Sequence, residues 1–217
     1  GYPTRLLHLA DPPLLLYVEG SVPALSVRQI AIVGSRNATA TGTATARELA
    51  CGLVTGGWAI TRGLAAGIEQ AAHLGALDRA RENDTVTVAV MGTGVDRVYP
   101  ARHRPLASAI ARHGALVSEQ PVGAAPKAEH FPRRNRLIAA FADGVLVVEA
   151  ALRSGSLITA RVAAELGREV FAVPGSIHSP QSRGCHWLIR QGACLVETQD
   201  NIESELSLTC PERSSPC

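Results

Sequence analysis

The stretch Ile30-Ala31-Ile32-Val33-Gly34-Ser35-Arg36 runs from four consecutive apolar residues directly into a small, polar turn. The apolar residues do not alternate with polar ones, which predicts a strand that is buried on both faces. Helix-favouring residues follow from Gly42 to Leu53. A buried strand, a glycine turn and a helix, in this order, are typical of the first unit of a doubly wound α/β protein.

The same unit recurs along the chain. Further strands are expected at residues 58–61, 85–90, 115–117, 145–148, 170–173 and 194–196, and further helices at 68–81, 102–113, 134–141, 156–166 and 184–191. This alternation predicts an α/β fold: an extended Rossmann-like, doubly wound, mostly parallel sheet with helices on both faces. We expect three parts: an N-terminal lead-in segment over 1–25, a Rossmann-like core over 26–206 and a flexible tail over 207–217.

Composition limits the function classes. A chain of 217 residues fits one large domain, and its net charge of +2 gives no global basic field. Any anion site therefore depends on local clustering. The five cysteines are odd in number and form no CxxC pair, which argues against a disulfide framework and a structural zinc. No signal peptide is visible and no apolar run reaches the ~18 residues of a membrane span, so we expect a cytoplasmic protein without membrane contact.

The densest charge cluster is Phe131-Pro132-Arg133-Arg134-Asn135-Arg136. Unpaired arginines are costly to bury, whereas a guanidinium matches phosphate with two hydrogen bonds and stacks on bases. Alone, the cluster is better explained as a solvated helix start. At about 100° per residue, Arg133 and Arg136 share one helix face and Arg134 turns elsewhere. We therefore expect Arg133 or Arg136 to contribute more to phosphate binding, with Arg134 pairing with Glu119 or Glu149.

Small residues follow most of the expected strands. In a doubly wound sheet, ligands bind beyond the carboxyl ends of the strands, and glycine lets the backbone approach a phosphate. One such loop is also what a tight turn needs, but several at one sheet edge, with Arg36 and the arginine cluster, favour an anionic ligand. The loops are Gly34-Ser35-Arg36, Gly63–Gly67, Gly92-Thr93-Gly94, Ser154-Gly155-Ser156 and Pro174-Gly175-Ser176.

The usual enzyme fingerprints are absent from the sequence. The first turn lacks GxGxxG, and neither GxxxxGK[ST] nor GxSxG occurs. The seven histidines show no metal-ligand spacing. Glu119 and Glu149 end strands, where we interpret them as carboxylates that pair with arginine or cap a helix. The sequence therefore predicts no catalytic residue, metal or cofactor.

These motifs together resemble the DNA-processing protein A family (DprA, also called Smf). The resemblance covers roughly residues 12–197. It is carried by Gly34-Ser35-Arg36, Gly63-Leu64-Ala65-Ala66-Gly67-Ile68, Ala72-His73, Tyr99-Pro100, Ser118-Glu119, Phe131–Arg136, Val148-Glu149-Ala150, Ser154-Gly155-Ser156-Leu157-Ile158-Thr159-Ala160, Val173-Pro174-Gly175, Leu188-Ile189 and Gly192-Ala193.

The resemblance implies a non-enzymatic protein that binds single-stranded DNA, protects incoming DNA and helps to load the RecA recombinase during natural transformation. It also implies a homodimer, which we expect to form through roughly residues 162–196. Four residues depart from the family pattern: Arg62, where serine is expected, Glu69, where aspartate is expected, and His103 and His186, where asparagine is expected. The DNA-binding residues that the resemblance implies are Ser35, Arg36, Gly63, Gly67, Lys127, Arg133, Arg134, Asn135, Arg136, Ser154, Gly155 and Ser156.

Two other function classes remain open. The first is a nucleotide-processing enzyme of the phosphoribohydrolase-like Rossmann group. The loop from Ser154 to Arg161 lacks the glutamate that such hydrolysis needs. The second is a protein–protein adaptor with a degenerate site, against which the complete arginine set argues.

Overall fold

The predicted first strand lies at the centre of the sheet. The computed structural model describes residues 1–82 and 84–209. Strand β2 (Gln29–Val33) is buried along its whole length. It belongs to an eight-stranded sheet with the order β1-β5-β4-β3-β2-β6-β7-β8. The other strands are β1 (Tyr17–Gly20), β3 (Ala59–Arg62), β4 (Thr87–Val90), β5 (Gly114–Ser118), β6 (Gly144–Val147), β7 (Glu169–Ala172) and β8 (Cys194–Leu195).

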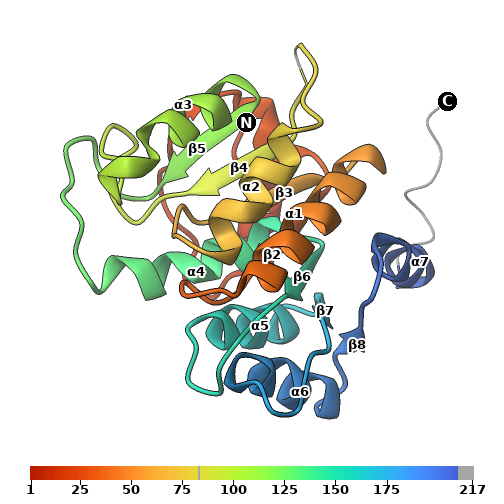
Figure 1. Ribbon diagram of the computed structural model, residues 1–217. Coiled ribbons are helices and arrows are strands. Elements are labelled where there is room, and N and C mark those ends of the chain that lie inside the picture. The colour runs from red at the N-terminus through yellow and green to blue at the C-terminus, as the bar shows by residue number, and fades with distance from the viewer. Residues whose placement is uncertain (83, 210–217) are drawn as a thin grey trace, which may run out of the picture.

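The sheet is parallel except at one edge, where β1 pairs antiparallel with β5. Helices cover both faces, so the predicted doubly wound fold is confirmed (Figure 1). Ile30 and Ile32 of β2 point into one core, and Ala31 and Val33 point into the other. The first core is covered by α1 (Ala40–Thr55), α2 (Ile68–Leu77) and α7 (Gln199–Thr209), and α3 (Arg104–Arg112) lies beside these helices. The second core is covered by η1 (Thr4–His8), η2 (Val22–Ser26), α4 (His130–Phe141), α5 (Ser156–Glu165) and α6 (Arg183–Arg190).

Helix α1 begins where Thr39 caps it. The Thr39 hydroxyl accepts a hydrogen bond from Gly42 N at 2.9 Å and donates one to Glu149 Oε1 at 2.6 Å. The Thr39 N–H donates to the other oxygen of Glu149 at 2.9 Å. A hydroxyl at this position satisfies a donor that the first helical turn leaves free. Glu149 therefore has the structural role that the sequence predicts for it.

The connections change direction beside β2. Its neighbours are β3 and β6, and the chain continues from β3 to one edge of the sheet and from β6 to the other. Val33 at the end of β2 is in register with Val147 at the end of β6. The loops that leave these two strands diverge, and such a switch point is where doubly wound folds bind ligands.

The first 25 residues, predicted as a lead-in segment, contain η1, β1 and η2. Leu6 is fully buried, and Arg5 binds Asp143 at 3.0 Å. At the other end, α7 was not predicted and runs past the expected boundary at 206 to Thr209. The rest of the expected tail, 210–217, lies outside the described residues. Within residues 1–82 and 84–209, no helix has the length and hydropathy that a membrane span needs, and no group of metal-ligating side chains is found.

Candidate nucleic-acid interface

The loops after β2 and β3 interlock at the switch point. Ser35 O accepts a hydrogen bond from Ile68 N at 3.1 Å, and Ser35 N donates to Glu149 O at 2.7 Å. Gly67 has a φ of +77°, and a Cβ there would collide with the carbonyl oxygens of Ser35 and Arg36. Only glycine combines this φ with so close an approach of two backbones. Gly67 therefore fixes the loop that presents Arg36.

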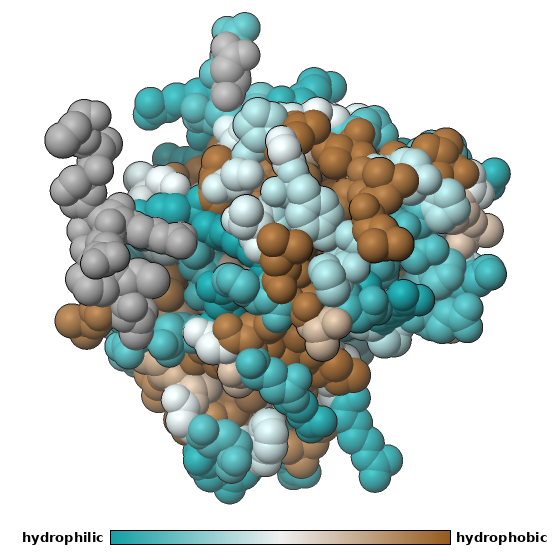
Figure 2. Space-filling model, turned by 180° about the vertical axis from the view of Figure 1, so that it is seen from behind, coloured by the Kyte–Doolittle hydropathy of each residue, from teal (hydrophilic) through white to brown (hydrophobic). Residues whose placement is uncertain are grey.

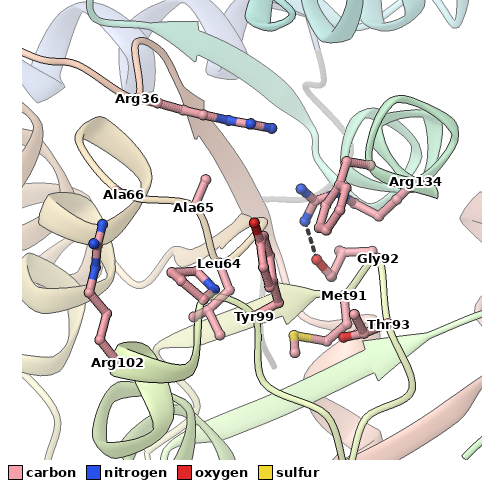
Figure 3. Close-up of a pocket in the computed structure, with 13 residues that line it drawn as sticks. Arg36, Leu64, Ala65, Ala66, Met91, Gly92, Thr93, Tyr99, Arg102 and Arg134 are labelled. Atoms are coloured by element: carbon pink, nitrogen blue, oxygen red, sulfur yellow. Dashed lines mark hydrogen bonds between the residues drawn. The ribbon is translucent and has the colours of Figure 1, made fainter. Parts of the chain in front are cut away.

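A hollow of about 390 Å³ opens beside these loops and is called the main hollow below (Figure 3). Arg36 and Arg134 extend toward each other on one side of it, and Arg102 stands on another wall. The rings of Tyr99 and Phe131 are 5.4 Å apart and tilted by 43°. The full lining is Arg36, Leu64, Ala65, Ala66, Val90, Met91, Gly92, Thr93, Tyr99, Pro100, Arg102, Phe131 and Arg134.

A smaller hollow of about 190 Å³ adjoins the main one and is called the side hollow. Arg36, Phe131 and Arg134 line both. The side hollow includes the turn before α5, where the hydroxyls of Ser154 and Ser156 are 2.7 Å apart. Its lining is Val33, Gly34, Arg36, Glu69, Phe131, Pro132, Arg134, Asn135, Ser154, Gly155, Ser156, Ile158 and Thr159. Hydroxyls, guanidinium groups and a helix N-terminus are groups that bind phosphate.

Arg134 lines both hollows. It is only 4% exposed and donates a hydrogen bond from Nη1 to Val90 O. Its guanidinium packs against Gly63, where a Cβ would collide with it. Burial lowers the pKa of Arg134, and nearby Glu69 partly offsets this effect. The prediction that Arg134 pairs with Glu119 or Glu149 is therefore wrong, because its side chain turns toward the end of β4.

Arg133 and Arg136 occupy another face of α4, as helical spacing predicts. Arg136 Nη2 lies 2.7 Å from Glu119 Oε2, and Arg133 Nε lies 3.8 Å from Glu119 Oε1. Both arginines also approach Asp11, at 3.6 and 3.7 Å. Neither lines either hollow. Glu119 has the arginine-pairing role predicted for it, whereas the expected primacy of Arg133 or Arg136 over Arg134 finds no support in this geometry.

The remaining predicted residues divide into two groups. Asn135, Ser154, Gly155 and Ser156 meet Arg36 and Arg134 in the side hollow. Lys127 lines neither hollow; it is exposed, and its carbonyl accepts a hydrogen bond from His130 N at 3.1 Å at the start of α4. The involvement of all these residues in DNA binding stays a prediction.

Arg62 neither points outward nor reaches the hollows. It is fully buried and donates hydrogen bonds to the carbonyls of Ile68 and Glu69, while its Nε and Nη2 have no hydrogen-bond partner among the described residues. Burial lowers the pKa of Arg62 to about 9. Burial also holds the pKa of neighbouring His73 well below its usual value, with the charge of Arg62 as a second cause. A buried cation with unpartnered nitrogens is costly to the fold.

The sequence-based list of site residues omitted Tyr99, Arg102 and Phe131, although all three line the main hollow. The Phe131 ring packs against Gly92, where a Cβ would lie 2.8 Å from the ring. Tyr99-Pro100 and Phe131 were visible as parts of larger motifs. Their convergence depends on the loops after β4 and β5 and could not be derived from spacing.

Comparisons with known proteins agree on one family. The family model described as DNA recombination-mediator protein A matches residues 1–207. Protein Smf of Escherichia coli (strain K12) is 50% identical over 206 residues, which cover 94% of this chain and 54% of that protein. DNA processing protein DprA of Streptococcus pneumoniae (strain ATCC BAA-255 / R6) is 42% identical over 204 residues, covering 94% and 71%.

Solved structures give the same result. The X-ray structure of the S. pneumoniae protein has a TM-score of 0.88 to this chain and covers 94% of it and 70% of that chain. DNA processing protein A from Helicobacter pylori, solved to explain its single-stranded DNA binding mode, has a TM-score of 0.87 at 28% identity and covers 96% and 94%. The chain spans about half the length of its E. coli relative. With a family model matched over nearly its whole length, this chain belongs to the DNA recombination-mediator protein A family.

Proposed function

We propose that this protein binds single-stranded DNA at the two adjoining hollows and acts as a recombination mediator without catalytic turnover. The observation that carries the proposal is the shared wall of Arg36, Phe131 and Arg134, which joins an aromatic-lined space to a space rich in phosphate-binding groups. A base stacks on aromatic rings whatever its identity, and arginines hold the adjacent phosphate. The family's H. pylori member, which binds single-stranded DNA, supports this assignment.

The shape of the site favours single strands over duplex. The main hollow, at about 390 Å³, falls within the ~300–1,000 Å³ of typical ligand pockets. A base reaches such a pocket only after it leaves the stack, which costs less in a single strand than in a duplex. The net charge of +2 gives little attraction to the outside of a duplex.

Loading of RecA and homodimerisation are further parts of the proposal. An apolar hollow of about 540 Å³ lies near β8 at the sheet edge, and all of its lining residues except Leu152 fall within the region expected to dimerise. Exposed Leu152, Ile177 and Leu195 line it, with exposed fractions of 53%, 74% and 44%. The lower half of the molecule, where α5 and α6 lie, shows apolar patches among hydrophilic residues (Figure 2). Burying such side chains against a second copy is favourable. We expect the protein to act in the cytoplasm, where RecA and incoming strands meet.

A titration at fixed salt tests the DNA assignment. A labelled dT oligonucleotide, a mixed-sequence single strand and the matching duplex are titrated with protein, and fluorescence anisotropy is recorded. Both single strands should bind with similar affinity and the duplex more weakly. Equal binding of the duplex would contradict the proposal that the hollows bind single-stranded DNA. Incubation with nucleoside monophosphates, followed by chromatography for free base, tests the enzyme alternative, and no base should appear.

A further inference from the structure

The side hollow contains one feature that phosphate binding does not explain. Glu69, from the first turn of α2, lines this hollow together with Arg36 and Arg134. Its Oε2 accepts a hydrogen bond from Ala65 N at 3.1 Å. Among the described residues that line the two hollows, Glu69 is the only acidic one. A carboxylate in an anion site repels the ligand that the arginines attract.

Positively charged side chains lie near this carboxylate without forming an ion pair with it among the described residues. Arg36 and Arg134 share the wall of the side hollow with it. Arg62 is fully buried behind it and donates to the Glu69 carbonyl. The charge of Glu69 partly restores the burial-lowered pKa values of both Arg62 and Arg134, so the carboxylate acts on both groups. Glu69 thus already supplies one negative charge to this arginine cluster.

We infer that Glu69 is a specificity-determining residue, which reduces the advantage that a doubly charged phosphate monoester has over a phosphodiester in this arginine-lined hollow. This inference rests on the proposed function, because it assumes that a phosphate enters the side hollow. A phosphodiester inside a strand carries one negative charge, whereas a terminal or free phosphate monoester carries about −1.5 to −2 at pH 7. Repulsion by a fixed carboxylate grows in proportion to ligand charge, so it penalises the monoester about twice as much.

This selection has a consequence for a protein that holds DNA. Free nucleotides offer the same base and phosphate as a strand and would compete for the hollows. Because Glu69 weakens the attraction of the arginines for the second charge of a monoester, it reduces the competition of free nucleotides with the internal positions of a strand. Glu69 also contacts Ala65 N near the start of α2, so a purely structural role is the alternative. That role predicts no dependence on ligand charge.

The decisive comparison uses two probes that differ only in phosphate charge. Thymidine 5′-monophosphate and its methyl ester, thymidine 5′-methylphosphate, each displace a labelled dT oligonucleotide from the protein at pH 8. For each protein, the ratio of the two probe concentrations that release half of the oligonucleotide is measured. Glu69→Gln keeps the shape and an acceptor for Ala65 N but removes the charge. This variant should improve the monophosphate relative to the methyl ester on the order of tenfold.

Glu48→Gln is the matched control, because Glu48 is an exposed carboxylate on α1 that lines neither hollow. It should leave the ratio of the two probes unchanged. The same ratio in Glu69→Gln as in wild type, or a shift of the ratio in favour of the methyl ester, would overturn the inference. Failure of both probes to displace the oligonucleotide would also overturn it. If Glu69→Gln does not fold, Glu69→Ala, which also removes the charge, provides the same comparison. Failure of the proposed function itself would appear earlier, as no binding of the labelled oligonucleotide.

Discussion

Replacing Arg36 with alanine tests the shared wall of the two hollows. Arg36 is exposed and lines both hollows, and no ion pair is found for it in the described part of the chain. Its removal should therefore change the free energy of unfolding by less than ~0.5 kcal/mol. Loss of one charge-assisted hydrogen bond costs about 1.5–3 kcal/mol, which corresponds to a roughly 10- to 150-fold weaker dissociation constant.

The assay is fluorescence anisotropy of a labelled dT oligonucleotide over a series of salt concentrations. The slope of log affinity against log salt should fall in magnitude by about 0.7 in Arg36→Ala, because one phosphate contact is lost. Arg112→Ala is the control. Arg112 is also exposed, but it ends α3 just before β5 begins, so it lies near the amino end of a strand, whereas the hollows lie beyond the carboxyl ends. An Arg36→Ala affinity within twofold of wild type, with the fold intact by circular dichroism, would show that Arg36 does not bind the DNA.

Three further variants have distinct expected outcomes. Gly63→Ala should weaken DNA binding, measured by anisotropy, because the new methyl displaces the Arg134 guanidinium; an unchanged affinity would show that the position of Arg134 does not matter for binding. Arg136→Ala should lower stability by about 1–3 kcal/mol in urea unfolding, because its nearly buried carboxylate partner loses its hydrogen bond; an unchanged midpoint would show that this pair is dispensable. Arg62→Met should raise the urea midpoint and increase the free energy of unfolding by about 1–4 kcal/mol, because two buried nitrogens of Arg62 lack hydrogen-bond partners among the described residues. A lower midpoint would mean that Arg62 holds α2 in place.

The pattern of apolar runs was sufficient to predict most of the sheet. The run Ile30–Val33 is buried on both faces because β2 is central. Central parallel strands are continuous apolar runs, which are easy to identify in a sequence. Strand β1 was not predicted because it is an edge strand, half exposed, and depends on pairing with β5. Helix α7 was missed because few of its side chains are apolar; Ile202 and Leu206 are the ones buried.

The site was predicted in outline, and its details depended on side-chain direction. Helical spacing separated Arg134 from Arg133 and Arg136, but it could not tell which face would meet the hollows. That depends on the position of α4 against β4, where Val90 O accepts from Arg134, and on Glu119 at the end of β5. Burial of Arg62 was equally invisible, since a charged residue at a strand end is usually exposed.

The central claim is that a base of single-stranded DNA enters the main hollow and stacks on Tyr99 or Phe131. The most direct measurement is photocrosslinking of an oligonucleotide that carries 5-iododeoxyuridine, followed by trypsin digestion and mass spectrometry. The sequence places Tyr99 in the tryptic peptide 98–102 and Phe131 in the peptide 128–133. We expect the crosslinked base to be attached to one or both of these peptides, and we expect Arg36→Ala to reduce the yield of the crosslink. Crosslinks found only on other peptides would contradict the central claim.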